Sequence, residues 1–141
     1  MSRSKRSAGQ PPSQPLEFWF DRSLGRTVPA ELRKLGWHIH LIADEFPDDA
    51  QNVADDTWID YGLARSWVPV CKDGRIKGRT DERHPLVVHQ AALFYLDNQQ
   101  LRIADMIARL SVNHARIERA AKRGGPAIYA VSADGVRKTW P

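Results

Sequence analysis

The sequence predicts an α/β fold in which helices flank a central, mostly parallel β-sheet and the chain ends in a β-hairpin. Short apolar runs alternate along the chain with stretches of helical periodicity, which is typical of βαβ units. Near the C-terminus, two apolar runs meet around Asp134-Gly135, a dipeptide that favours a tight turn. The length of 141 residues and the hydrophobic content of 42% fit one domain with its own core.

The domain is expected to span 16–141, because residues 1–15 are polar, proline-rich and without apolar periodicity, as in a disordered tail. Prolines follow the basic start, where a signal peptide would have an apolar run. The longest apolar stretch, 86–96, is interrupted by polar residues and is shorter than the roughly 18 residues that span a membrane. The single cysteine, Cys71, has no partner for an internal disulfide. We therefore expect a cytoplasmic protein without membrane contact.

The first elements predict a βαβ unit. Residues 16–20, LEFWF, form an aromatic run that suits a buried strand. A helix is expected over 30–35, because Pro29 fits the first turn of a helix and Gly36 fits the position just after its end. Residues 37–42, WHIHLI, alternate like a second strand.

The next stretch predicts a loop, a helix and a third strand. An acidic loop is expected at 44–49. The helix runs over 54–63, since its first turn is acidic and the helix dipole favours negative charge there. The strand at 67–71 contains Pro69, which has to lie where no ladder hydrogen bond is needed.

The last third of the chain completes the alternation. A short helix marked by a proline is expected at 81–90, and a fourth strand at 91–96. The apolar spacing over 101–121 predicts one long amphipathic helix that ends at a Gly-Gly pair. Strands at 128–131 and 136–140 form the expected hairpin.

The net charge of +4 hides an uneven distribution, because 11–73 is acidic and 74–141 is basic. A basic half is consistent with a nucleic-acid-binding surface, and ordinary solvated surface charge explains it as well.

Four aspartates are expected at one edge of the sheet. Asp21 and Asp73 directly follow strands, Asp44 follows the second strand closely, and Asp55 begins a helix. The carboxyl ends of parallel strands form the ligand crevice of open α/β sheets. Carboxylates gathered there repel one another, and a divalent cation with hard oxygen ligands, Mg²⁺ or Mn²⁺, removes the repulsion. Taken one at a time, each acid is better explained as a cap or a loop residue, and only the four together favour a functional site.

Such a site favours hydrolysis of phosphodiesters, because bound metal ions activate water and stabilise the charge that develops on the phosphate. Basic residues beside Asp73 are expected to hold the backbone of the nucleic acid; they are Lys72, Arg75, Lys77 and Arg79. Further basic residues on or near the long helix extend this track; they are Arg102, Arg109, Arg116, Arg119, Lys122 and Arg123.

Four segments together resemble a known family. They are Phe20-Asp21-Arg22-Ser23-Leu24-Gly25, Asp44-Glu45-Phe46-Pro47, Asp55-Asp56-Thr57-Trp58-Ile59 and Val70-Cys71-Lys72-Asp73-Gly74-Arg75-Ile76. In this order they are similar to the successive signatures of PIN-like domains, and in particular of the VapC-type toxins of bacterial toxin–antitoxin pairs. The resemblance covers about 16–132.

The resemblance implies a PIN-like three-layer fold and a metal-dependent endoribonuclease that hydrolyses RNA and is held inactive by a cognate antitoxin. Asp21, Asp55 and Asp73 would form the acidic metal site for Mg²⁺ or Mn²⁺, with Asp44 as a further catalytic acid. The resemblance is also compatible with a homodimer.

The sequence departs from the family pattern at two places. Cys71 lies where relatives often have Thr or Ser before the Lys-Asp pair. The fourth acid of standard PIN nucleases has no clear counterpart, and Asp97, with Asn98 as a polar neighbour, is the one candidate.

Two other functions fit parts of the pattern. One is a PIN-like module that binds nucleic acid or a partner without catalysis. The other is a phosphoacceptor receiver domain, which also gathers acids around Mg²⁺ but needs a lysine at the end of its fifth strand, and 128–133 contains none.

Overall fold

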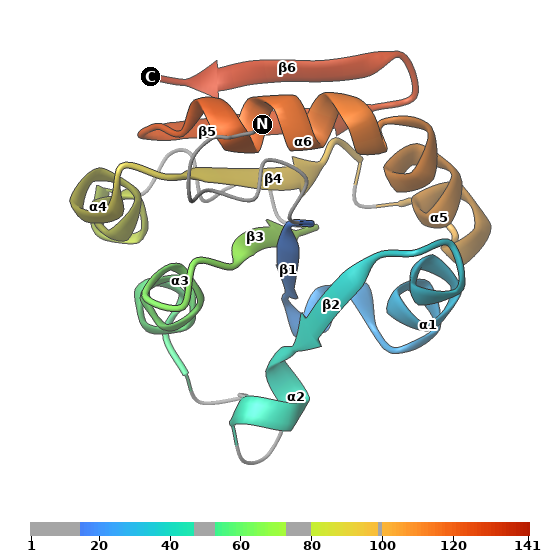
Figure 1. Ribbon diagram of the computed structural model, residues 1–141, viewed down its shortest axis with the longest axis horizontal. Helices are drawn as coiled ribbons and strands as arrows, with labels where there is room; N and C mark the ends of the chain where they lie inside the picture. Colours follow the sequence, from blue (N-terminus) through green and yellow to red (C-terminus); the bar gives the residue numbers. More distant parts are fainter. Residues whose placement is uncertain (1–14, 47–52, 73–79, 99) are drawn as a thin grey trace, which may run out of the picture.

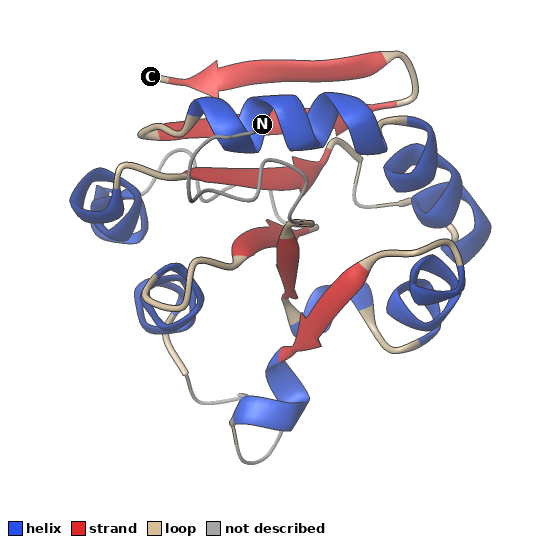
Figure 2. Ribbon diagram, in the orientation of Figure 1, coloured by secondary structure: helices blue, strands red, loops and turns tan. Residues whose placement is uncertain are grey.

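The computed structural model describes residues 15–46, 53–72, 80–98 and 100–141, and the expected tail lies outside these ranges apart from Pro15. A six-stranded sheet lies between two layers of helices (Figure 1, Figure 2). The strands are β1 (Glu17–Phe20), β2 (His38–Leu41), β3 (Val68–Cys71), β4 (Ala92–Leu96), β5 (Ala127–Ser132) and β6 (Gly135–Trp140). The helices are the 3₁₀ turn η1 (Arg22–Leu24), α1 (Thr27–Lys34), α2 (Ile42–Glu45), α3 (Asp55–Leu63), α4 (Thr80–His89), α5 (Ile103–Val112) and α6 (His114–Arg123). None of these helices, as far as they are described, is long and apolar enough to cross a bilayer.

The strand order is β2-β1-β3-β4-β5-β6, and every neighbouring pair is parallel except β5 with β6. The predicted fold class and the terminal hairpin are therefore confirmed. The chain places β2 on one side of β1 and β3 on the other, so the strand order reverses between β1 and β3. In open α/β sheets, ligands bind beyond the carboxyl ends of the strands at such a point.

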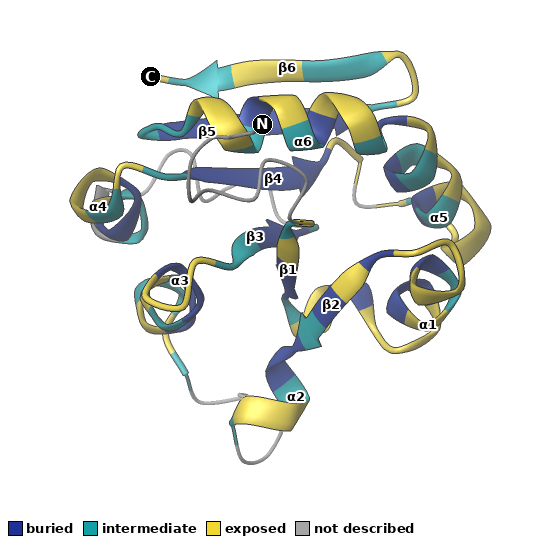
Figure 3. Ribbon diagram, viewed as in Figure 1, coloured by how far each residue is buried: buried dark blue, intermediate teal, exposed yellow. Residues whose placement is uncertain are grey.

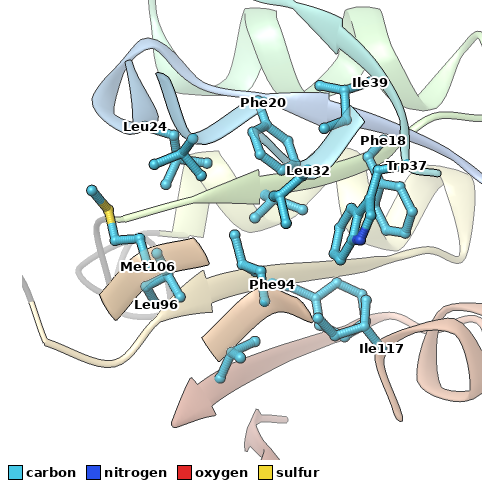
Figure 4. Packing of buried hydrophobic residues seen from close by; sticks show 14 of the residues in the cluster. Phe18, Phe20, Leu24, Leu32, Trp37, Ile39, Phe94, Leu96, Met106 and Ile117 are labelled. Carbon is cyan, nitrogen blue, oxygen red and sulfur yellow. The ribbon is translucent and has the colours of Figure 1, made fainter. Parts of the chain in front are cut away.

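Alternation along β1 separates two hydrophobic cores. Phe18 and Phe20 face the layer of α1, α5 and α6, where Leu32 and Ile117 pack with them (Figure 4). Trp19, between them in the sequence, faces α3 and α4 on the other side of the sheet. The inner strands β4 and β5 are buried almost throughout (Figure 3), as expected when helices cover both faces of a parallel sheet.

The first βαβ unit forms as predicted, with a longer helix. α1 begins at Thr27 and contains Pro29 in its first turn. It ends at Lys34, and Gly36 then adopts a φ of 100°, a left-handed conformation that glycine reaches without the steric penalty of a side chain. The chain can thereby turn directly into β2.

Pro69 lies in an inner strand. In β3 it is in register with Trp19 of β1, whereas the ladder between β3 and β4 is formed by Val70 and Cys71. Pro69 therefore precedes the ladder on the β4 side, which agrees with the expectation that its missing N–H occupies a position without a ladder bond.

The expectation of one long helix over 101–121 is wrong, because the chain breaks at Asn113 into α5 and α6. Asn113 is fully buried, and its side-chain Nδ2 donates to the carbonyl oxygens of Arg109 at 2.9 Å and of Ser132 at 2.8 Å. The second bond ties the break to the end of β5. The amide bonds come in addition to the backbone bond from Asn113 to Arg109, and they hold the chain at this turn although the apolar spacing continues.

The acidic stretch expected to be a loop at 44–49 is helical at its start. Asp44 and Glu45 belong to α2, a single turn that follows β2 directly and buries Ile42 beneath it. Residues 47–52 lie outside the described ranges.

Candidate active site

Asp21 lies directly beyond β1, at the point where the strand order reverses. Its backbone N–H still donates to the carbonyl of Val70 in β3 at 3.1 Å, so its position is determined by the sheet. It then begins η1, with its carbonyl accepting from the N–H of Leu24. The half-buried side chain therefore emerges at the carboxyl edge between β1 and β3.

Ser23 holds the carboxylate of Asp21 in place. Its Oγ donates to Oδ2 of Asp21 at 2.8 Å and accepts from the backbone N–H of Lys72 at 3.2 Å. One hydroxyl thus links the carboxylate to the segment that follows β3. The sequence analysis assigned Ser23 no role, although a serine two residues after a strand-end aspartate is a short-range pattern in which such bonds are common.

Asp55 is the first residue of α3, and two tryptophans position it. Nε1 of Trp58 donates to Oδ1 of Asp55 at 2.8 Å, and Nε1 of Trp19 donates to the carbonyl of Trp58 at 2.7 Å. Both indoles are almost completely buried. Gly62 of α3 makes room for this arrangement, because a Cβ at that position would overlap the Trp19 ring. The carboxylate of Asp55 is therefore held through α3 against the centre of β1.

Asp21 and Asp55 face the same cleft, which has a volume of about 460 Å³. Its lining residues come from the end of β1 and η1, from α2, and from the start of α3 and the residues before it; they are Asp21, Arg22, Ser23, Ile42, Val53, Asp55 and Trp58. Burial is the main cause of a raised pKa at Asp21, and the negative charge of Asp55 raises it further. Hydrogen bonds from Ser23 and from the backbone N–H of Arg22 oppose this shift without cancelling it.

The raised pKa of Asp21 means that its negative charge is incompletely compensated in the folded protein. A divalent cation between Asp21 and Asp55 would compensate both carboxylates, and oxygen donors suit Mg²⁺ or Mn²⁺. Within the described part of the chain, no three His, Cys, Asp or Glu side chains form a group that could hold a metal ion. Asp73, the third expected ligand, follows Lys72 and lies outside the described residues.

The other predicted site residues are placed as follows. Asp44 is exposed on α2 and is absent from the lining of the cleft. Lys72 is half-buried, and its backbone N–H donates to Oγ of Ser23. Arg75, Lys77 and Arg79 lie outside the described residues. Asp97 follows β4 at the same edge of the sheet and is exposed, with Oδ2 at 4.0 Å from Nη2 of Arg137.

Two arginines that the sequence analysis did not assign to the site lie next to Asp21. Arg22 lines the cleft and also a neighbouring hollow of about 30 Å³, which Asp21 and Arg26 line too. Both arginine side chains are exposed. Arg22 therefore places positive charge in the cleft beside the carboxylates, and Arg26 adds charge next to it.

The fold and the site define an α/β protein with two carboxylates in a cleft where the strand order of its sheet reverses. Comparison with known proteins identifies the family. The chain belongs to the PIN-like domain family: the family model described as "PIN like domain" matches residues 16–98. Within that family it is related to the VapC type. It is 33% identical over 116 residues to a protein of Mycobacterium tuberculosis (strain H37Rv) named "Putative ribonuclease VapC45", and the match covers 81% of this chain and 84% of that protein. No solved structure matches the chain significantly.

Proposed function

We propose that this protein is a metal-dependent endoribonuclease, the toxin of a type II toxin–antitoxin pair. The observation that carries the proposal is the convergence of Asp21 and Asp55 on one cleft, from β1 and α3, where the strand order reverses. The name of the mycobacterial relative favours RNA as the substrate.

In this proposal Asp21, Asp55 and Asp73 hold Mg²⁺ or Mn²⁺. When bound, such an ion lowers the pKa of water and stabilises the negative charge that develops on the phosphodiester. Ser23 keeps the Asp21 carboxylate aimed at the cleft, and Trp58 does the same for Asp55. Asp44, on the neighbouring α2, is proposed as the further acid.

The positive side chains around the cleft would orient the RNA. Lys72, Arg75, Lys77 and Arg79 are proposed to contact the phosphates on the side of β3. Arg22 would contact them on the side of β1, since it lines the cleft next to Asp21. Arginine suits this role because its planar guanidinium donates two parallel hydrogen bonds to a phosphate.

A cognate antitoxin is the proposed protein partner. A segment that covers the cleft would keep RNA from Asp21 and Asp55, and a basic side chain inserted between the carboxylates would replace the metal ion. We further propose that the toxin acts in the cytoplasm and that two copies pair.

The proposal is tested with the purified protein, freed of antitoxin, on a mixture of cellular RNAs. We expect cleavage with Mg²⁺ or Mn²⁺ and none after addition of EDTA. Asp55→Asn should lower the rate at least about 100-fold, because changes to residues that only orient a metal ligand already lower activity about 10- to 100-fold. The matched control is Asp60→Asn on the exposed side of the same helix, where Asp60 accepts a hydrogen bond from His89; it should cleave at the wild-type rate.

Two results would contradict the proposal. The first is a wild-type protein that cleaves no RNA with metal present and antitoxin absent. The second is an overexpression phenotype that Asp21→Asn leaves intact while neutralisation of Arg75, Lys77 and Arg79 abolishes it, which would indicate a PIN-like binding module without catalysis.

A further inference from the structure

The exposed charged residues on the outer side of α6 are all basic. Ile117 and Ala120 are buried against the sheet and determine the rotation of the helix. The exposed side (Figure 3) consequently presents basic residues at helical spacing; they are Arg116, Arg119, Lys122 and Arg123. The one acid of α6, Glu118, lies 3.6 Å from His114. α1 differs, because there Lys34 pairs with Glu31 at 2.9 Å.

The last strand adds a fifth positive charge to this surface. In the register of the hairpin, Lys138 of β6 lies opposite Tyr129 of β5. Tyr129 belongs to the core beneath α6, and residues that pair across a sheet point to the same face. Lys138 is exposed and therefore lies on the α6 side. We call these residues the α6 basic surface: Arg116, Arg119, Lys122, Arg123 and Lys138.

Among the described residues, no neighbouring acid neutralises the cations of the α6 basic surface. In the part of the chain that the structure describes, none of the five forms an ion pair within 4.0 Å. Arg116 donates to Oδ1 of Asn113 at 3.1 Å, which holds its guanidinium close to the helix. A row of cations without acidic partners attracts a polyanion more strongly than a helix with mixed charges.

The α6 basic surface is separated from the cleft. Asp21 follows β1, whereas α6 packs over β4 and lies beside β6, and β3 lies between β1 and β4. Two strand spacings amount to about 10 Å. Phosphates that contact this surface therefore lie at least about three nucleotides from the cleft, at roughly 3.4 Å per nucleotide along one strand of a duplex.

We propose that the α6 basic surface binds the phosphate backbone of RNA at a distance from the cleft, so that the protein prefers long or folded RNA to short oligonucleotides. The inference deepens the proposed ribonuclease function and rests on it. The sequence analysis placed the four basic residues of α6, without Lys138, on one track with Arg102 and Arg109. The structure separates them, because Arg109 lies on α5 and donates to the carbonyl of Asp97.

The test compares a double variant of the surface, Arg119→Gln with Lys122→Gln, with wild type. The substrates are a folded RNA of about 40 nucleotides and a pentanucleotide that contains its cleavage site. We expect a raised KM for the folded RNA and unchanged cleavage of the pentanucleotide. Each lost phosphate contact should also reduce the slope of log affinity against log salt by about 0.7 to 0.9. Between 50 and 200 mM salt, wild type should therefore lose about eightfold more affinity than the variant.

The matched control removes the same charge elsewhere, with Lys34→Gln and Arg65→Gln, both exposed and outside the α6 basic surface. The inference would be overturned if the surface variant bound folded RNA as tightly as wild type does. It would also be overturned if the surface variant and the control lost the same amount of RNA affinity. Wild-type RNA binding combined with loss of a protein partner would overturn it too, since the surface would then be a protein interface.

Binding measured on the Asp21→Asn background separates this inference from the proposed function. If RNA binds there and the surface variant weakens it, the surface contacts RNA even if no cleavage is ever found. If the Asp21→Asn protein binds no RNA, the inference is wrong whatever the activity of the wild type.

Discussion

The ends of β1 and β4 resemble each other in the backbone and differ in the chemistry they create. Asp21 follows β1 and Asp97 follows β4, and each donates its backbone N–H to a carbonyl of the next strand, at 3.1 and 3.0 Å. Asp21 is half-buried and feels the charge of Asp55, whereas Asp97 is exposed near Arg137. β1 adjoins the reversal of the strand order and β4 does not. An aspartate at a strand end therefore becomes part of a site only where the topology brings a second carboxylate to it.

The largest effect is expected from exchanging each of the two aspartates for asparagine. Asp21→Asn should lower RNA cleavage at least about 100-fold, because it removes a direct ligand of the proposed metal. Asp97→Asn should change the rate less than about threefold, since an exposed carboxylate 4.0 Å from an arginine contributes little. Initial rates with Mg²⁺ measure both. Comparable losses would mean that Asp97 completes the acidic site and that the two strand ends are equivalent.

A smaller effect is expected from the hydroxyl that distinguishes the end of β1. Ser23→Ala removes the bond to Oδ2 of Asp21 and the acceptor for the N–H of Lys72. Loss of a hydrogen bond that orients a metal ligand should weaken apparent metal affinity about 10- to 100-fold. Ser23→Thr keeps a hydroxyl and should restore most of it. Titration of activity with Mg²⁺ separates the two variants, and a loss in Ser23→Ala that added Mg²⁺ does not recover would show that Ser23 acts other than through the metal site.

The smallest effect is expected on the stability of the fold. Most aspartates stabilise the folded state when they ionise, whereas ionisation of Asp21 should destabilise it. Because the pKa of Asp21 is raised in the folded state, the folded protein binds a proton more tightly than the unfolded chain does. Ionisation of Asp21 thus destabilises the fold as the pH rises from the unfolded pKa near 3.8 through the higher folded pKa. Asp21→Asn should therefore raise the Tm at pH 7, by an amount that disappears below about pH 3.8.

Asp97→Asn provides the comparison for this measurement, since Asp97 is exposed and should leave the Tm at pH 7 nearly unchanged. Thermal melts at pH 7 and pH 3.5 in metal-free buffer decide the matter. An Asp21→Asn protein that melts lower than wild type at pH 7 would mean that the carboxylate stabilises the fold, and that it has a cationic partner. In a separate measurement, addition of Mg²⁺ should raise the Tm of wild type more than the Tm of Asp21→Asn.

Much of the fold could be predicted from local patterns. The strands at 16–20, 67–71 and 91–96 were recognisable because buried strands of a parallel sheet are short and nearly all apolar, and the strand at 37–42 was recognisable from its alternation. The break at Asn113 could not be predicted, since the apolar spacing runs through it. The partner that ends the helix is the carbonyl of Ser132, which is close only after folding.

The site was predictable only in part, for the same reason. That Asp21 and Asp55 would lie at one edge followed from the order of strands and helices. The support of Asp55 was not predictable, because it runs from Trp19 through Trp58 and joins residues 39 apart in the sequence.

The sequence by itself determined most of the segments that become strands and helices and that aspartates follow several of the strands, because periodicity and short-range chemistry act over a few neighbouring residues. Only the tertiary structure decided that Asp21, rather than Asp97, shares a cleft with Asp55. It also decided that Lys138 of the last strand lies on the same side as the cations of α6. The order of strands in the sheet sets these distances, and contacts between distant segments select that order.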